Sequence, residues 1–107
     1  MMKKELQLYE LVLLLKFTTV EEVALERINF YRDFITNNGS QVMVKNHGKK
    51  ALAYPIKGFD SATYVQVVYI GNQNLIKQIN VEIQRDDFVL RGLTTKLTDS
   101  SIIEKFA

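Results

Sequence analysis

The order in which the hydrophobic period changes along the chain most strongly constrains its fold. From Leu6 to Phe17 the residues alternate with period two, and one parity carries no charged residue, which predicts a strand with one buried face. From Val20 to Ile35 the apolar residues recur at helical spacing. The period then returns to two for two strands, becomes helical again around Ile79, and ends in a fourth strand.

Local signals predict where the two helices begin and end. Thr18 and Thr19 each precede a glutamate by three residues, so we expect a capping box to start the first helix. Gly39 can adopt the left-handed conformation that ends a helix, so the first helix is expected to stop just before it. Asn72 is the expected cap of the second helix, which stops near Arg85.

The second strand carries two further signals. The glycine of His47-Gly48 suggests a bulge or bend within it. Pro55 cannot donate to a sheet ladder, so this strand either ends near Tyr54 or lies at an edge. The expected ranges are 41–53, 62–70 and 88–97 for the second, third and fourth strands, with a loop at 56–60.

Two strand–helix–strand units with right-handed crossovers form one four-stranded antiparallel sheet with both helices on one face. The predicted fold class is therefore α+β, the ferredoxin-like βαββαβ split. With 107 residues, 47% of them hydrophobic, the chain is expected to form a single domain with its core at 6–97. Residues 98–107 are expected to form a short polar tail with a small apolar cluster, made of Ile102, Ile103 and Phe106.

Composition excludes several kinds of chemistry. The chain has no cysteine and one histidine, which excludes thiolate zinc sites, iron–sulfur clusters, cysteine nucleophiles and three-histidine metal sites. Its five glycines are scattered and form no phosphate-binding loop. No apolar run approaches the ~20 residues of a membrane helix. We therefore expect no catalytic residue, cofactor, metal ion, small-molecule substrate or membrane contact.

Two polar features are better explained without catalysis. His47 has no nucleophile or orienting carboxylate beside it in the sequence. Asp86 and Asp87 are adjacent acids at a helix-to-strand turn, and neighbouring side chains of an extended chain point to different sides. We interpret both aspartates as turn residues in water.

Basic residues interleaved with aromatic ones are a stronger functional signal. Lysines neutralise phosphates, and tyrosines stack on unpaired bases, so such a segment is typical of RNA binding. An edge strand protected by lysines against pairing explains the same residues equally well, and composition alone leaves both interpretations open. The segment comprises Lys45, His47, Lys49, Lys50, Tyr54, Lys57 and Phe59.

Residues 48–56 read Gly-Lys-Lys-Ala-Leu-Ala-Tyr-Pro-Ile. This segment closely resembles a signature of the family of bacterial-type ribosomal protein six of the small subunit, which is a glycine, two basic residues, any residue and Leu-Ala-Tyr-Pro-Ile. The resemblance extends from about Leu6 to Leu97. Further stretches similar to the family are Tyr9-Glu10, residues 62–65 and residues 85–91.

The resemblance implies a non-enzymatic, structural constituent of the small ribosomal subunit. It implies binding to the central domain of small-subunit ribosomal RNA together with ribosomal protein eighteen of the small subunit. By position, Lys49 and Lys50 match the family's basic pair, and Arg91 matches an arginine of its fourth strand. The candidate RNA-binding residues are therefore Lys45, His47, Lys49, Lys50, Tyr54, Lys57 and Arg91.

The second face of the sheet and the N-terminus add two expectations. Leu8, Val12 and Leu14 lie on the mixed parity of the first strand, and burying them against a partner gains ~25 cal/mol per Å². A protein partner on this face is therefore expected. The N-terminal segment does not fit a targeting peptide, so we expect the protein at the ribosome of a bacterial cytoplasm or a plastid stroma.

Two other classes share this order of elements. A ferredoxin-like regulatory domain that binds a small metabolite needs a glycine-lined pocket, which the sequence does not indicate. An acylphosphatase-like enzyme needs an anion-cradling loop with an arginine after the first strand. Residues 16–19 at that junction are Lys-Phe-Thr-Thr, with neither glycine nor arginine. Co-sedimentation with small ribosomal subunits, as opposed to homodimer formation, separates the ribosomal interpretation from the metabolite-binding one.

Overall fold

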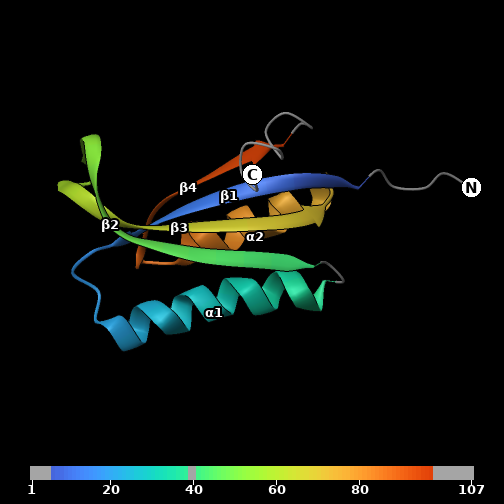
Figure 1. The fold of residues 1–107 in the computed structure, drawn as a ribbon, viewed down its shortest axis with the longest axis horizontal. Helices are drawn as coiled ribbons and strands as arrows, with labels where there is room; N and C mark the ends of the chain where they lie inside the picture. The colour runs from blue at the N-terminus through green and yellow to red at the C-terminus, as the bar shows by residue number, and fades with distance from the viewer. Residues whose placement is uncertain (1–5, 39–40, 98–107) are drawn as a thin grey trace, which may run out of the picture.

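Strands and helices follow one another in the predicted order in the computed structural model, which describes residues 6–38 and 41–97 (Figure 1). The expected Gly39 cap and the expected tail at 98–107 lie outside the described residues. No helix within the described ranges is long and apolar enough to cross a membrane. The elements are β1 (Gln7–Lys16), α1 (Glu21–Asn37), β2 (Val42–Ile56), β3 (Phe59–Gly71), α2 (Gln73–Arg85) and β4 (Val89–Lys96).

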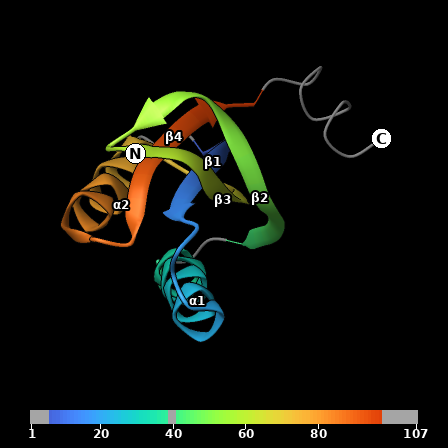
Figure 2. The same ribbon diagram turned by 90° about the vertical axis from the view of Figure 1, so that its left-hand side faces the viewer.

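The four strands form one antiparallel sheet in the order β2-β3-β1-β4. Both helices lie on the same side of this sheet (Figure 2), which confirms the ferredoxin-like arrangement. The main core lies between the helices and the uncharged parity of β1, as the alternation predicted. Its most deeply buried side chains are Leu11, Leu13, Leu15, Tyr31, Ile35, Val65, Val67, Tyr69 and Ile79.

The face without helices carries a second apolar cluster. Leu14 and Ala62 alternate with helix-facing residues of β1 and β3, so they point to the opposite side of the sheet. Ile56 and Leu90 complete this buried cluster, and half-buried side chains such as Tyr64 pack around it. We call this side of the sheet the uncovered face.

The predicted capping box at the start of α1 is wrong. Val20 occupies the cap position, and no side chain caps the helix. The chain first forms a turn in which the Thr19 amide donates to the Lys16 carbonyl at 3.0 Å, so the helix begins after both threonines. The predicted cap of α2 is confirmed, because Asn72 Oδ1 accepts the Leu75 amide at 3.0 Å.

The β2–β3 hairpin is longer than predicted. The sequence indicated a loop at 56–60, but the turn consists of Lys57 and Gly58, and β3 begins at Phe59. Lys57 and Gly58 have φ angles of 51° and 87°, as tight two-residue hairpin turns require. Pro55 lies within β2, which is tolerated because β2 is an edge strand, one of the two alternatives that the proline left open.

Asp86 is not a solvated turn residue, which corrects the interpretation from sequence. Its side chain is 2% exposed and lies 2.9 Å from Arg27 Nη2. Asp86 Oδ2 also accepts hydrogen bonds from Arg27 Nε at 2.9 Å and from the Tyr31 hydroxyl at 2.8 Å. Asp86 Oδ1 accepts the Phe88 amide at 3.0 Å. The carboxylate therefore ties α1 to the turn between α2 and β4, while Asp87 stays exposed.

Two buried tyrosines predict how stability depends on alkaline pH. Burial, together with the hydrogen bond to Asp86, raises the pKa of Tyr31 well above its usual value of 10.0. Burial also raises the pKa of Tyr69. Above about pH 10 the unfolded chain loses these protons first, so the free energy of unfolding falls as pH rises, by ~1.4 kcal/mol per pH unit for each tyrosine.

Denaturant unfolding between pH 8 and about pH 11 measures this dependence, with Tyr31→Phe as the comparison. Above about pH 10, the free energy of unfolding of the variant should fall less steeply with pH, by ~1.4 kcal/mol per pH unit. The reason is that the variant keeps the ring and removes the titrating hydroxyl. Equal slopes for the two proteins would contradict a raised pKa at Tyr31.

Candidate nucleic-acid interface

The β2–β3 hairpin projects beyond the rest of the sheet and forms an arm at one end of the molecule (Figure 1). β1 pairs with β3 as far as Lys16 opposite Ala62, so residues 51–61 lie past the end of β1. Tyr54 lies on this arm with 61% of its surface exposed, and Lys57 occupies the turn. The arm therefore presents an aromatic ring and a cation at its projecting end.

The predicted irregularity at His47-Gly48 is confirmed. The pairing of β2 with β3 shifts between Asn46 and Gly48, and Gly48 has a φ of 80° that favours glycine. His47 is the extra residue of this bulge. Its Nε2 donates to Gln66 Oε1 at 2.9 Å, and its ring lies edge-on to Tyr64 with the centroids 5.4 Å apart. His47 is thus held over the uncovered face, and its contacts are structural.

Lys49 and Lys50 lie on opposite faces of the β2–β3 ladder, because they are neighbours in a strand. The Lys49 ammonium lies 4.3 Å from the centroid of the Phe17 ring, within range of a cation–π interaction. Lys50 instead pairs with Ala62 on the uncovered face. Lys49 and Lys50, which are adjacent in the sequence, therefore point to opposite sides of the sheet at the base of the arm.

A cluster that sequence reasoning found only in part, since it did not join Lys16 and Phe17 to Lys49 and Phe59, lies where the arm leaves the sheet. We call it the arm-base cluster, and it consists of Lys16, Phe17, Lys49 and Phe59. The Phe17 and Phe59 rings meet edge-on at 5.9 Å, and the Lys16 ammonium lies 6.0 Å from the Phe59 centroid. Lys16 and Lys50 both pair with Ala62 from opposite sides, so they belong to one row across β1, β3 and β2. A lysine at the end of a strand, followed by an aromatic residue, was the available signal.

Arg91 and Lys45 lie on the uncovered face, at opposite edges of the sheet. Arg91 on β4 pairs with Leu14, and Lys45 on β2 pairs with Gln66. Both side chains are exposed. The seven candidate residues therefore form two groups, which are Lys49, Lys50, Tyr54 and Lys57 on the arm or at its base, and Lys45, His47 and Arg91 on the uncovered face.

The cations of these two groups are electrostatically available. Within residues 6–38 and 41–97, the ion pairs are Arg27 with Asp86 and Arg32 with Asp33, so no candidate lysine or arginine is neutralised by a carboxylate. Lys57 does face acids across a hollow of about 290 Å³, which is also lined by Lys16, Asp86 and Asp87. Unpaired cations on a projecting arm are suited to bind backbone phosphates, which are polyanionic and accessible.

The described residues hold no group of three or more histidine, aspartate or glutamate side chains that could bind a metal ion. The candidate interface therefore consists of cations, an exposed tyrosine and the apolar residues beside them. Such a set can dock a folded nucleic acid by charge and shape, but it offers no nucleophile activated by a base.

Comparison with known proteins identifies the family. Residues 8–96 match the family model described as Ribosomal protein S6. The chain belongs to the ribosomal protein S6 family. The match covers all six elements except the first residue of β1. The S6 family consists of ribosomal proteins, which agrees with the expectation that this protein is not an enzyme and removes support from the metabolite-binding alternative.

Relatives come from bacteria and from plastids. The chain is 42% identical over 90 residues to small ribosomal subunit protein bS6 of Gloeothece citriformis, covering 83% of this chain and about half (51%) of that protein. It is 38% identical over 93 residues to protein bS6c of Pyropia yezoensis, covering 86% of this chain and 85% of that one. These relatives place the S6 protein at the ribosome, in a bacterial cytoplasm or a plastid.

A solved structure supports the fold independently of the sequence match. The crystal structure of 30S ribosomal protein S6 from Thermotoga maritima superposes with a TM-score of 0.83 at 16% identity. The superposition covers 94% of this chain and 96% of that one. The fold of this S6 protein is therefore that of a bacterial relative of low sequence identity.

Proposed function

We propose that this S6 protein binds the central domain of small-subunit ribosomal RNA, together with ribosomal protein eighteen of the small subunit. The observation that carries the proposal is the placement of Lys16, Lys49 and Lys50 on the two faces of the sheet at the base of a projecting arm, without carboxylate partners among the described residues. Membership of a family of ribosomal proteins supports RNA as the polyanion.

The arm and the sheet edge contact RNA in different ways. Lys49 and Lys50 point to opposite sides of the arm, so they can bind phosphates of two strands or of two turns of one strand. Lys57 at the turn extends this charge toward the tip, and exposed Tyr54 offers a ring for an unpaired base. Arg91 adds a bidentate phosphate donor on the uncovered face.

The uncovered face supports the proposed protein partner. Leu93 pairs with half-buried Val12 there and is 50% exposed, and Met43 on β2 and Ile70 on β3 are 44% and 41% exposed. Burying such side chains gains ~25 cal/mol per Å² of apolar surface. A polar line crosses the same face, because Gln66 accepts from His47 at 2.9 Å and donates to Glu10 at 2.6 Å. An apolar surface with one fixed polar line favours a protein partner in a single orientation.

A binding assay with purified components tests the proposal. A central-domain fragment of small-subunit ribosomal RNA is titrated with this protein alone, with ribosomal protein eighteen alone, and with both. We expect tighter binding by the pair than by either protein, and weaker binding of both to a fragment of equal length from another domain. Equal affinities for the two fragments, or no gain from the second protein, would refute the proposal.

The partner surface predicts a separate effect of Leu93. Leu93→Lys places a charge in the apolar area of the uncovered face and should weaken binding of ribosomal protein eighteen by at least tenfold, while stability stays within ~0.5 kcal/mol. Leu25→Lys is the matched control, because Leu25 is 56% exposed but lies on α1. Isothermal titration with the partner protein measures both variants. Equal affinities would remove the uncovered face from the partner interface.

A further inference from the structure

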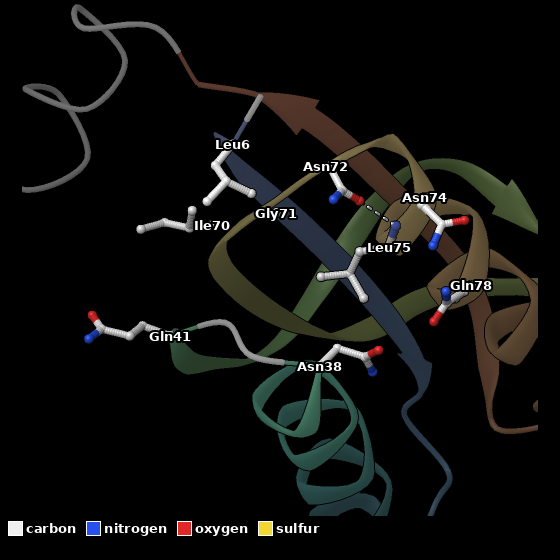
Figure 3. A pocket seen from close by; sticks show the side chains of 9 residues that line it. All are labelled: Leu6, Asn38, Gln41, Ile70, Gly71, Asn72, Asn74, Leu75 and Gln78. Carbon is white, nitrogen blue, oxygen red and sulfur yellow. Dashed lines mark hydrogen bonds between the residues drawn. The ribbon is translucent and has the colours of Figure 1, made fainter. Parts of the chain in front are cut away.

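A cavity of about 450 Å³ lies at the end of the molecule opposite the arm, where β3 leads into α2 and α1 ends (Figures 1 and 3). This volume falls within the ~300–1,000 Å³ range of small-ligand sites. The molecule is 48 Å along its longest axis, so the cavity is well separated from the arm-base cluster. The residues that line it are Leu6, Asn38, Gln41, Ile70, Gly71, Asn72, Asn74, Leu75 and Gln78.

Among the described residues that line this cavity, the polar side chains are all carboxamides and none is charged. Asn72 is already used, because its oxygen caps α2. Asn38 donates to the Phe34 carbonyl at 2.7 Å, which leaves its own oxygen as an acceptor. Asn74 and Gln78 are four residues apart on α2, and their side chains make no hydrogen bond to another described residue. They offer donors and acceptors side by side.

Apolar groups complete the cavity. Figure 3 shows Leu75 between the carboxamides of Asn74 and Gln78 on one side and Ile70 on the other. Gly71 lets Leu75 approach closely, because a Cβ at this position would lie 3.0 Å from Leu75 Cδ2 and 3.1 Å from the Tyr69 ring. The cavity thus joins an apolar surface, suited to the flat face of a ring, to carboxamides suited to its polar edge.

We propose that this cavity binds an unpaired nucleobase of the RNA that the arm holds by its phosphates. A carboxamide carries a donor and an acceptor in the spacing of a base edge, as asparagine and glutamine show when they read adenine. Unpaired RNA bases are recognised by hydrogen bonds to their edges together with contacts to their faces. A phosphate is disfavoured because the described lining residues include no cation. The inference rests on the proposed RNA-binding function and adds a second, base-specific contact at the other end.

Titration of the isolated protein with nucleosides tests the cavity directly. Adenosine, cytidine and uridine are added to ¹⁵N-labelled protein up to millimolar concentration, with inorganic phosphate as a separate probe. We expect at least one nucleoside to shift the side-chain amide signals of Asn74 and Gln78 and the backbone signal of Gly71, with phosphate shifting none of them. No shift with any nucleoside, or the same shift with phosphate, would overturn the proposal.

A pair of double variants tests the cavity in the RNA complex. Asn74→Ala/Gln78→Ala removes the two carboxamides, and Gln73→Ala/Asn80→Ala removes the same two residue types from the same helix. Gln73 and Asn80 are exposed and line neither this cavity nor the hollow beside Lys16 and Lys57. Alanine favours helix in both variants, so both should fold. The first variant should lose about tenfold in RNA affinity and the second should lose nothing.

The outcomes separate this inference from the proposed function. If both double variants bind RNA like the wild type while Lys49→Gln/Lys50→Gln weakens binding, the cavity proposal fails and the proposed function stands. If the cavity variant weakens binding of ribosomal protein eighteen in place of RNA, the cavity proposal also fails. If the wild-type protein does not bind the RNA, the proposed function fails, and the nucleoside titration still decides on the cavity.

Discussion

Asp86→Ala should lower the free energy of unfolding by about 2–4 kcal/mol. The substitution removes the carboxylate that accepts from Arg27, Tyr31 and the Phe88 amide, and it leaves the Tyr31 hydroxyl buried without an acceptor. We expect a smaller loss of stability than for a fully buried ion pair, because the Arg27 side chain is 28% exposed and can reach water. Thermal unfolding should therefore shift down by roughly 10–25 °C.

Two comparisons show whether the hydrogen bonds cause this loss. Asp87→Ala removes an exposed carboxylate at the neighbouring position and should change stability by less than ~0.5 kcal/mol. In the Tyr31→Phe background, Asp86→Ala should cost less than in the wild type, because the orphaned hydroxyl is absent. Denaturant unfolding of the wild type and of the four variants measures these effects. Equal effects of the Asp86 and Asp87 substitutions would contradict the buried role of Asp86.

The triple variant Lys16→Gln/Lys49→Gln/Lys50→Gln should bind the central-domain RNA roughly 100-fold more weakly at 0.1 M salt. Each lysine that neutralises a phosphate releases a counterion, so the slope of log affinity against log salt should fall by ~2–3. The substituted side chains lie on strands or just at a strand end and carry no ion pair within the described part of the chain, so the fold should persist. Filter binding over a salt series measures affinity and slope together.

A variant of equal charge change controls for net charge. Arg32→Gln/Lys77→Gln/Lys96→Gln also removes three cations, but from α1, α2 and the end of β4, away from the arm. Its salt slope should stay within ~0.5 of the wild type, since a long-range change in charge affects association without removing a phosphate contact. Equal losses in the two triple variants would show that total charge, and not the arm, governs binding.

The fold could be predicted from the sequence because burying one face of a strand or helix makes apolar residues recur with the period of that element. The uncharged parity of β1 faces the helices, and the stripe through Ile28, Tyr31 and Ile35 faces the sheet. The start of α1 was not predictable in the same way. Thr18 and Thr19 fit a capping box and a turn equally well, and the bond from the Thr19 amide to the Lys16 carbonyl selects the turn. The length of the β2–β3 hairpin was underestimated because Pro55 can either end a strand or lie within an edge strand. Only the order of the strands in the sheet shows that β2 is an edge strand.

The candidate site was predictable in its residue types but not in its grouping. Lys49 and Lys50 stood out by sequence, whereas Lys16 joins them only through the register that places it and Lys50 on either side of Ala62. Asp86 was misinterpreted because its partners, Arg27 and Tyr31, are 59 and 55 residues away. Contacts of that separation leave no local pattern, so a buried acid at a turn looks like a solvated one.

Crosslinking in intact ribosomes tests the central claim most directly. Small subunits that contain this protein are irradiated, digested with nuclease and protease, and examined by mass spectrometry for peptides that carry nucleotides. The account predicts nucleotides of the central domain on peptides from residues 45–57 and on the peptide that contains Arg91. Crosslinks confined to α1, or nucleotides from another RNA domain on the arm peptides, would contradict it.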